Sequence, residues 1–364
     1  MGRPVRARAH HFVSAIAVTG ALLMMTSLPA GAATVAAATS RPGTSRSSTP
    51  HPRVGHSRAG ILPAVRGAAT PPANRLPGRT FLHACLLVSR AAPAQRRCES
   101  AALPVINAAR ASEGVGPMQL PAAFATMSAP LQFLVVTDLE RVGRGLPAAA
   151  ALSPALDRLA QAGANTSSDP PMPSGAGSVG ANWAGGLGST LLTDFLWMYD
   201  DGPGSSNLGC TYSGAPGCWV HRRNILAGYQ APLLMGAATA GASAAIELAG
   251  GATRWAAATP SWRSIAATIP VGLSSDNVSI SAAPGHIEGR HVTVWAAAGG
   301  TVARFTLRGG GRQWWLVRST CRLRAGGHCN VWFGYRPATS ASRASLVVNA
   351  VGGSRSVALR GHPA

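Results

Sequence analysis

The sequence contains no lysine, and all 32 of its basic residues are arginine. Alanine and glycine are abundant, so we attribute this absence to the coding bias of a high-GC genome and to no functional demand for arginine. Acidic residues are also scarce, with 12 Asp and Glu, and the formal net charge is +20. Most of the acidic residues lie between residues 101 and 256, so the basic regions are the first hundred residues and the last hundred.

Several signatures of catalytic and metal sites are missing as well. The sequence has no G-x-S-x-G nucleophile elbow. No two cysteines have the two-residue spacing of common zinc knuckles. After residue 32, no apolar run approaches the ~20 residues that a helix needs to span a bilayer. These absences argue against a serine hydrolase of that type, a zinc knuckle and a membrane span in the mature chain.

The first 32 residues have the three parts of a signal peptide. Three arginines precede an uncharged apolar stretch over residues 12–28, and Ala30-Gly31-Ala32 supplies a small-x-small cleavage signature. We predict cleavage before Ala33 and export of the mature protein. A single membrane anchor is the alternative, but the apolar stretch is short for that role and contains glycine, threonine and serine.

Six cysteines occur as three close pairs. Six cysteines allow 15 connectivities, and sequence alone does not choose between them. Export favours oxidation, and local pairing is the simplest arrangement. The predicted disulfides are therefore Cys85–Cys98, Cys210–Cys218 and Cys321–Cys329.

Composition divides the mature chain into four segments. Residues 33–80 are rich in Ser, Pro, Gly and Arg with few large apolar residues, which predicts a disordered basic linker. Residues 81–99 form a disulfide-closed lead-in, residues 100–256 the main domain and residues 257–364 a second domain. The basic linker is able to attract anionic cell-wall polymers or lipid headgroups, whereas specific binding of nucleic acid is not expected.

The main domain has helical patterns first and strand patterns last. Apolar residues recur at three- and four-residue spacing between Glu99 and Gln161, and Ser153-Pro154 is a plausible helix start within that stretch. A further helix is predicted over Ser189–Tyr199. Residues 163–188 and 201–218 are predicted loops, and Leu233–Thr239 and Ser243–Leu248 are predicted strands.

After Ala256, short alternating runs separated by glycine-rich turns predict a β-sandwich. The segment from Cys321 to Pro337, together with Ser345-Leu-Val-Val and Val357-Ala-Leu359-Arg-Gly361, resembles the terminal strands of Ig-like domains of the Hydin-type, choice-of-anchor class. Three tryptophans lie among arginines here, an arrangement that could stack single-stranded nucleic acid. We expect them to be core residues, or surface residues next to arginine. They are Trp314, Trp315 and Trp332.

Four short pieces of the main domain resemble the CAP superfamily of cysteine-rich secretory, antigen-five and pathogenesis-related proteins. That resemblance implies a three-layer α-β-α sandwich, so the whole chain is expected to be α+β: a CAP-like domain followed by an all-β Ig-like sandwich, after a disordered tail. The pieces are Asp138-Leu-Glu140-Arg141 with Gly145-Leu146, Leu156 with Ala160, Gly180-Ala181-Asn182-Trp183-Ala184, and Trp197-Met198 with His221-Arg222-Arg223-Asn224-Ile225-Leu226.

Departures from the CAP pattern concern its central cleft. Members place two histidines and two acidic residues there, whereas here Ala181 replaces one acidic residue and His221 is the only histidine of residues 101–256. The resemblance leaves His221 and Asp200 as the remaining pair and as weak metal candidates. The expected cleft residues are His221, Asp200, Asn182, Trp183 and Asp169, with no catalytic residue, no bound metal and no cofactor.

These features predict a secreted bacterial protein, free or associated with the cell wall, that binds an unidentified extracellular ligand through a degenerate CAP cleft without catalysis. Two alternatives stay open. One is a divalent-cation-dependent hydrolase such as a peptidase, and the other is a wall-associated structural or adhesive protein in which this domain is only a scaffold.

Overall fold

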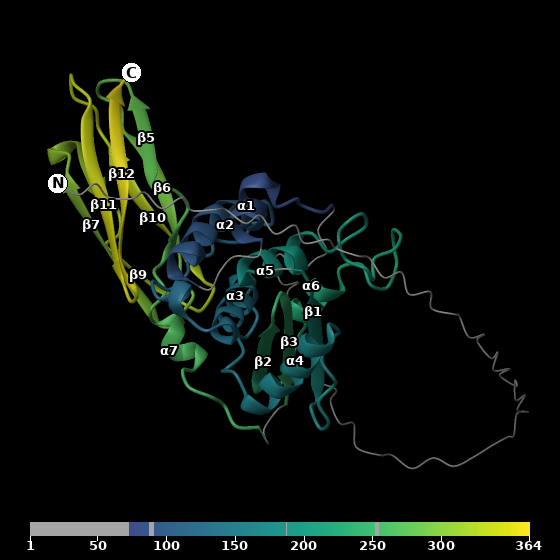
Figure 1. Ribbon diagram of the computed structural model, residues 1–364. Coiled ribbons are helices and arrows are strands. Elements are labelled where there is room, and N and C mark those ends of the chain that lie inside the picture. The colour runs from purple at the N-terminus through teal and green to yellow at the C-terminus, as the bar shows by residue number, and fades with distance from the viewer. Residues whose placement is uncertain (1–72, 87–90, 187, 252–254) are drawn as a thin grey trace, which may run out of the picture. The chain divides into compact units, whose positions relative to one another are not determined.

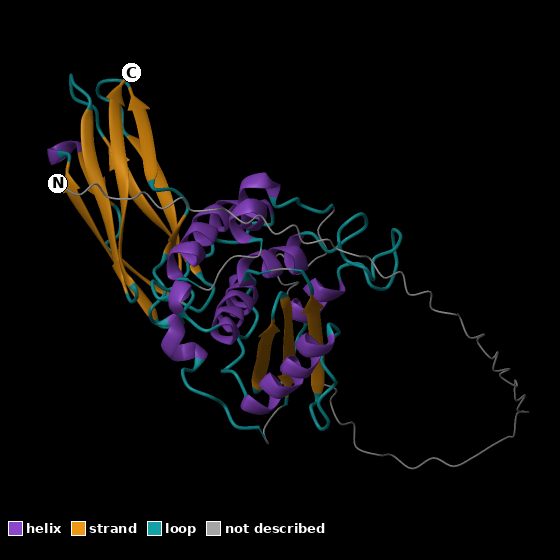
Figure 2. Ribbon diagram, viewed as in Figure 1, coloured by secondary structure: helices purple, strands orange, loops and turns teal. Residues whose placement is uncertain are grey.

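The computed structural model describes residues 73–86, 91–186, 188–251 and 255–364. The predicted signal peptide and residues 33–72 of the predicted linker lie outside these ranges. The last residues of that linker are ordered, because helix α1 (Gly78–Cys85) starts there and the Asn74 side chain accepts a hydrogen bond of 2.7 Å from the Gly202 amide. The described chain contains both helices and sheets, as predicted (Figure 2).

Helices dominate the first part of the described chain, as the apolar spacing predicted (Figure 1). Pro93 and Pro130 lie in the first turns of α2 and α3, and Pro154 is the first residue of α4, where a missing amide hydrogen costs no helical hydrogen bond. The remaining helices of this part are α2 (Ala92–Ser112), α3 (Ala129–Gly143), α4 (Pro154–Thr166), α5 (Thr190–Tyr199), α6 (Val220–Leu226) and α7 (Trp262–Ala266).

An antiparallel three-stranded sheet accompanies these helices, with strand order β1-β3-β2. Strands β2 (Leu233–Ala240) and β3 (Ser243–Gly250) match the two predicted strands. Strand β1 (Ser178–Ala184) lies in a segment that we predicted to be loop. Its Gly180 is required by packing, because a Cβ atom there would overlap the Tyr229 hydroxyl.

Side chains of β2 and β3 alternate between two apolar clusters. Leu234 and Ala249 pack with Leu156 of α4, and their neighbours Met235 and Leu248 belong to the large core formed with α2, α3 and α5. This alternation is what a strand with both faces buried produces. Helices therefore cover both faces of the sheet.

The second part of the chain is a two-sheet β structure around its own core, with Val292, Phe333 and Leu346 fully buried in it. Strand order is β4-β6-β10-β8 in one sheet and β5-β12-β11-β7-β9 in the other. The strands are β4 (Gly272–Leu273), β5 (Asn277–Ala282), β6 (Glu288–Trp295), β7 (Thr301–Gly309), β8 (Trp314–Leu316), β9 (Thr320–Leu323), β10 (His328–Tyr335), β11 (Ser342–Ala350) and β12 (Gly353–Pro363).

All three predicted disulfides are present: Cys85–Cys98, Cys210–Cys218 and Cys321–Cys329. The first joins α1 to α2, and both of its cysteines are completely buried. The second closes the loop between α5 and α6, and the third joins β9 to β10. A chain with three disulfides is consistent with an extracellular protein.

Removing the Cys85–Cys98 disulfide should destabilise the protein. The bond closes a loop of about 15 residues, for which the chain-entropy model gives roughly 3 kcal/mol. We expect the double variant Cys85→Ala, Cys98→Ala to lose about that much unfolding free energy in a urea titration. The double variant Cys321→Ala, Cys329→Ala, which removes a less buried disulfide from the other domain, serves as a comparison. An unchanged midpoint for the first variant would contradict the prediction.

Candidate functional site

The imidazole of His221 pairs with Asp201 and not with the predicted Asp200. His221 Nδ1 lies 2.6 Å from Asp201 Oδ1, and the His221 backbone amide donates to Asp201 Oδ2 over 3.0 Å. The ring stacks on Trp197 with centroids 6.1 Å apart. Helix α5 ends at Tyr199, so the next residue turns away and the one after it reaches the start of α6.

The two predicted residues of β1 have structural contacts. Asn182 is fully buried and donates a hydrogen bond of 3.0 Å to the carbonyl oxygen of His221. Its Oδ1 atom accepts one of 3.0 Å from Asn224. Trp183 Nε1 donates to Ser243 Oγ over 2.8 Å. Asn182 thus fixes α6 to the sheet through the His221 backbone, whereas Trp183 fixes β1 to β3.

Neither of the two predicted acidic residues is hydrogen-bonded or ion-paired to the imidazole, whose partner is Asp201. Asp200 is buried, and burial raises the pKa of its carboxyl group, with a further increase from the charge of Asp201. Asp169 is exposed, and its charge acts on Glu247 of β3. Within the described residues, no group of three or more His, Cys, Asp or Glu side chains is arranged to hold a metal ion. No described helix is both long and apolar enough to cross a bilayer.

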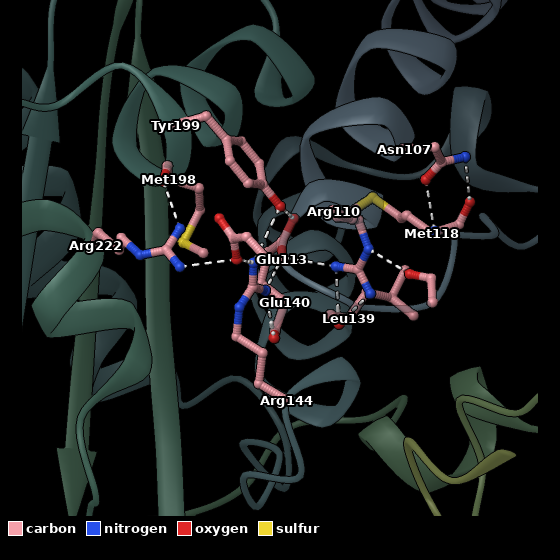
Figure 3. A network of polar contacts seen from close by, with 11 residues as sticks. Asn107, Arg110, Glu113, Met118, Leu139, Glu140, Arg144, Met198, Tyr199 and Arg222 are labelled. Atoms are coloured by element: carbon pink, nitrogen blue, oxygen red, sulfur yellow. Dashed lines mark hydrogen bonds and ion pairs between the residues drawn. The ribbon is translucent and has the colours of Figure 1, made fainter. Parts of the chain in front are cut away.

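A buried network of charged side chains joins four helices (Figure 3). Glu140 of α3 is in ion pairs with Arg110, at 2.6 Å, and with Arg144. Glu140 Oε1 also accepts a hydrogen bond of 2.8 Å from the Tyr199 hydroxyl. Glu113 Oε2 lies 2.6 Å from Arg144 and 2.9 Å from Arg222 of α6, which extends the network.

Electrostatics keep this network charged. Burial alone would raise the pKa of Glu140, but the charges of Arg110 and Arg144 outweigh it and hold that pKa below its ordinary value. Asp194 of α5 behaves in the opposite way: burial raises the pKa of its carboxyl group, and the charge of Glu140 raises it further, which favours the neutral form. Glu140 is completely buried, as are Arg144 and Tyr199 to within a few per cent, so these groups stabilise the helix packing and are out of reach of a ligand.

A pocket of about 580 Å³ lies elsewhere, between the starts of α3 and α5, helix α4 and the β2–β3 turn. We call it the polar pocket for its polar groups, although apolar side chains such as Met127 and Phe133 also line it. Its walls come from five separate segments, so no local sequence pattern marks it. Among the described residues that line it, Asp157 alone has an ionisable side chain. The other polar lining side chains are Gln95, Ser128, Gln132, Gln161, Ser189, Thr190, Thr193 and Thr239.

Hydrogen bonds fix the polar groups of this pocket before any ligand binds. Gln132 Nε2 donates to the Phe124 carbonyl oxygen over 2.9 Å, and its Oε1 accepts from Thr190 over 3.1 Å. Asp157 Oδ1 accepts from the Ala237 amide over 3.0 Å. Burial raises the pKa of Asp157, and that hydrogen bond lowers it in part. The pocket therefore presents preorganised amides and hydroxyls with one carboxyl group.

Comparisons with known proteins give structural matches only. No family model matches the chain, and no curated protein sequence does. Among solved structures, the PapD-like domain of human CEP192 is 10% identical, at a TM-score of 0.23, over 26% of this chain and 84% of that domain. The E. coli chaperone DraB is 11% identical, at a TM-score of 0.22, over 26% of this chain and 55% of DraB. WR4, a C. elegans MSP family member, is 8% identical, at a TM-score of 0.21, over 26% of this chain and 97% of WR4. The chain spans only about half the length of the chaperones it matches.

The predicted CAP membership is wrong. The matching structures are PapD-like and chaperone-like Ig-like β domains, which also leaves the narrower choice-of-anchor assignment unsupported. Residues of the four CAP-like pieces have local structural roles in this fold. Asn182 and Arg141 bond to backbone carbonyls, and Trp197 and Leu156 fill apolar cores. Such packing requirements recur in unrelated folds and do not identify a family.

Proposed function

We propose that this protein is an extracellular, non-catalytic binding protein that holds a neutral small molecule bearing hydroxyl or amide groups in the polar pocket. The observation that carries the proposal is the lining: many fixed amide and hydroxyl groups, one carboxyl group and no basic side chain among the lining residues. The pocket volume of about 580 Å³ lies in the range of ordinary ligand sites. The binding expected from the sequence is retained, but its place moves away from His221.

Charge and helix ends together favour a neutral ligand. Ser128 and Ser189 precede α3 and α5, so the amide groups at two helix N-termini border the pocket. These ends attract the partial negative charge of carbonyl or hydroxyl oxygens. Asp157 repels full anions and accepts a hydrogen bond from a ligand O–H or N–H group. A cation would have one carboxylate and no second charged ligand.

Catalysis has little support in this arrangement. A nucleophile needs an adjacent base, and the serines and threonines of the pocket lining have no histidine or lysine beside them. The alternative of a divalent-cation-dependent hydrolase rests on His221 and Asp201, which supply one imidazole and one carboxylate, fewer than the three protein ligands of catalytic zinc sites. The proposal also includes weak, salt-screened attraction of the basic linker to anionic wall polymers or lipid headgroups.

Calorimetric titration with N,N′-diacetylchitobiose tests the pocket. This probe is neutral and carries both hydroxyl and amide groups. We expect saturable binding that is lost in Ala242→Trp, since the indole would fill the pocket beside the β2–β3 turn. Asp157→Asn should weaken binding about tenfold, because a charge-assisted hydrogen bond becomes a neutral one.

The control is Ala150→Trp, which adds the same indole at an exposed position that does not line the pocket. It should bind like the unmodified protein. Diglucuronate of matched size tests charge and should bind more weakly than the neutral probe. Tighter binding of the anion, or equal binding by Ala242→Trp and Ala150→Trp, would contradict the proposal.

A further inference from the structure

One face of the β4-β6-β10-β8 sheet carries exposed aromatic side chains. In the β6–β10 register Val292 pairs with Val331 in the core, so the next pair, His291 and Trp332, points away from it. The two rings lie 4.5 Å apart, and Trp332 is 48% exposed. On the other side of Trp332, the exposed Val317 donates its backbone amide to the Trp332 carbonyl oxygen over 3.0 Å.

The next row across the same face is flat. It consists of Gly289, Gly334 and Trp315, which pair across β6, β10 and β8. A Cβ atom on Gly334 would overlap the indole ring of Trp315, so this ring lies directly over the glycine. The result is a planar surface that we call the tryptophan platform, made by Trp315 and Trp332 with His291 and Val317 beside them.

Hydrogen-bonding groups and positive charge border this platform. One row beyond Trp332, Thr293 donates to Asn330 over 2.8 Å on the same face. Arg336, two residues beyond Gly334, is exposed. Residues 257–364 contain only two acidic residues, and each lies beside an arginine: Asp276 at 3.0 Å from Arg355, and Glu288 at 3.9 Å from Arg290. The domain therefore keeps a large excess of positive charge, and Arg336 brings part of it to the end of the strand that carries the platform.

We propose that the tryptophan platform binds an acidic polysaccharide. The C–H groups on one face of a pyranose ring are weakly positive and fit the negative face of an indole. Trp332 and the Gly334 position that supports Trp315 are two residues apart along the strand direction, about 7 Å. Neighbouring sugar rings of one chain can thus contact both indoles, while arginines attract their carboxylates and Asn330 meets hydroxyl groups.

The alternative occupants are a single-stranded nucleic acid and a second copy of this chain. Stacking rings with nearby cations would also suit a nucleic acid. Three disulfides favour an oxidising environment outside the cell, where acidic polysaccharides are the abundant polyanions. A second copy would bring two strongly basic surfaces together, which charge repulsion disfavours.

Calorimetric titration of the full mature chain at 0.15 M salt tests the platform with three probes of equal length: hexagalacturonate, maltohexaose and hexathymidylate. We expect hexagalacturonate to bind most tightly. Trp332→Ala and Trp315→Ala should each weaken that binding about tenfold, because each removes one stacking ring without changing the charge. Gly334→Val, which must lift the indole of Trp315, should have a similar effect.

Tyr212→Ala is the matched control, since it removes an exposed aromatic side chain from the α5–α6 loop. It should leave the affinity unchanged. His291→Ala, at an exposed position, provides a second platform variant if a tryptophan variant fails to fold by circular dichroism. Equal affinity of the Trp332→Ala and unmodified proteins overturns the proposal. So does tighter binding of maltohexaose or hexathymidylate, or a dimer that dissociates in Trp332→Ala.

Discussion

Replacing Glu140 with glutamine should lower the free energy of unfolding by about 3–5 kcal/mol, the range found when one partner of a buried ion pair is removed. Glu140 accepts from Arg110, Arg144 and Tyr199, and none of these groups can turn to water. The amide would leave the buried guanidinium group of Arg110 without a compensating charge, and Arg144 would keep only its ion pair with Glu113. Urea denaturation at pH 7, with the disulfides intact, measures the change.

The control is Glu288→Gln, the same chemical change in the exposed pair with Arg290. Exposed pairs contribute about 0–1 kcal/mol, so this variant should unfold at nearly the midpoint of the unmodified protein. A loss below about 1 kcal/mol for Glu140→Gln would show that the network contributes little to stability. Expression of the variant at reduced temperature would provide enough folded protein for the measurement.

Glu247→Gln should stabilise the protein, and increasingly so as pH rises from 5 to 8. Glu247 is completely buried, and no described residue donates a hydrogen bond to either of its oxygens. Its neighbours across the sheet are Ala181 and Gly236, which offer no polar side chain. Burial, with the charge of Asp169, raises the pKa of Glu247 to about 8 from an ordinary 4.5.

The direction of this pH dependence follows from the number of protons that the folded and unfolded states bind. Below pH 4.5 the folded and unfolded states both hold the proton, so the carboxyl group then gives no pH dependence. Between 4.5 and 8 the unfolded chain releases it while the folded chain keeps it, so stability falls by up to about 1.4 kcal/mol per pH unit. We expect the advantage of Glu247→Gln over the unmodified protein to grow by about 2–4 kcal/mol from pH 5 to 8.

Urea titrations at several pH values give this difference directly. The variant keeps Asp138 and Asp194, whose pKa values burial also raises, so their contribution cancels in the comparison. Glu288→Gln again serves as the control, and its difference from the unmodified protein should stay constant. A Glu247→Gln advantage that does not change with pH would contradict the raised pKa.

Periodic segments were predictable from the sequence, and one strand was not. The predicted strands Leu233–Thr239 and Ser243–Leu248 match β2 and β3, and Pro154 starts a helix as expected. Strand β1 was missed because Ser178, Gly180 and the other small residues of that segment have low strand propensity. Its conformation comes from pairing with β3 and from the contact of Gly180 with Tyr229, which are long-range interactions.

The candidate site was likewise predictable only in part. Asn182 bonds to the His221 backbone because β1 and α6 are neighbouring regular elements. The acidic partner was misassigned by one residue, since the end of α5 at Tyr199 decides which carboxylate faces α6. The polar pocket left no local signature, because Gln132, Thr190 and Asp157 come from three helices and meet only after folding.

The buried arginines also turn trypsin into a probe of the core. Because the chain has no lysine, every internal tryptic site follows an arginine. Arg110, Arg141, Arg144 and Arg222 are each at most 3% exposed, so a protease reaches those bonds only when the helices separate. The rate of cleavage after Arg141 then reports the population of that open state, whereas cuts at exposed arginines report only local fraying.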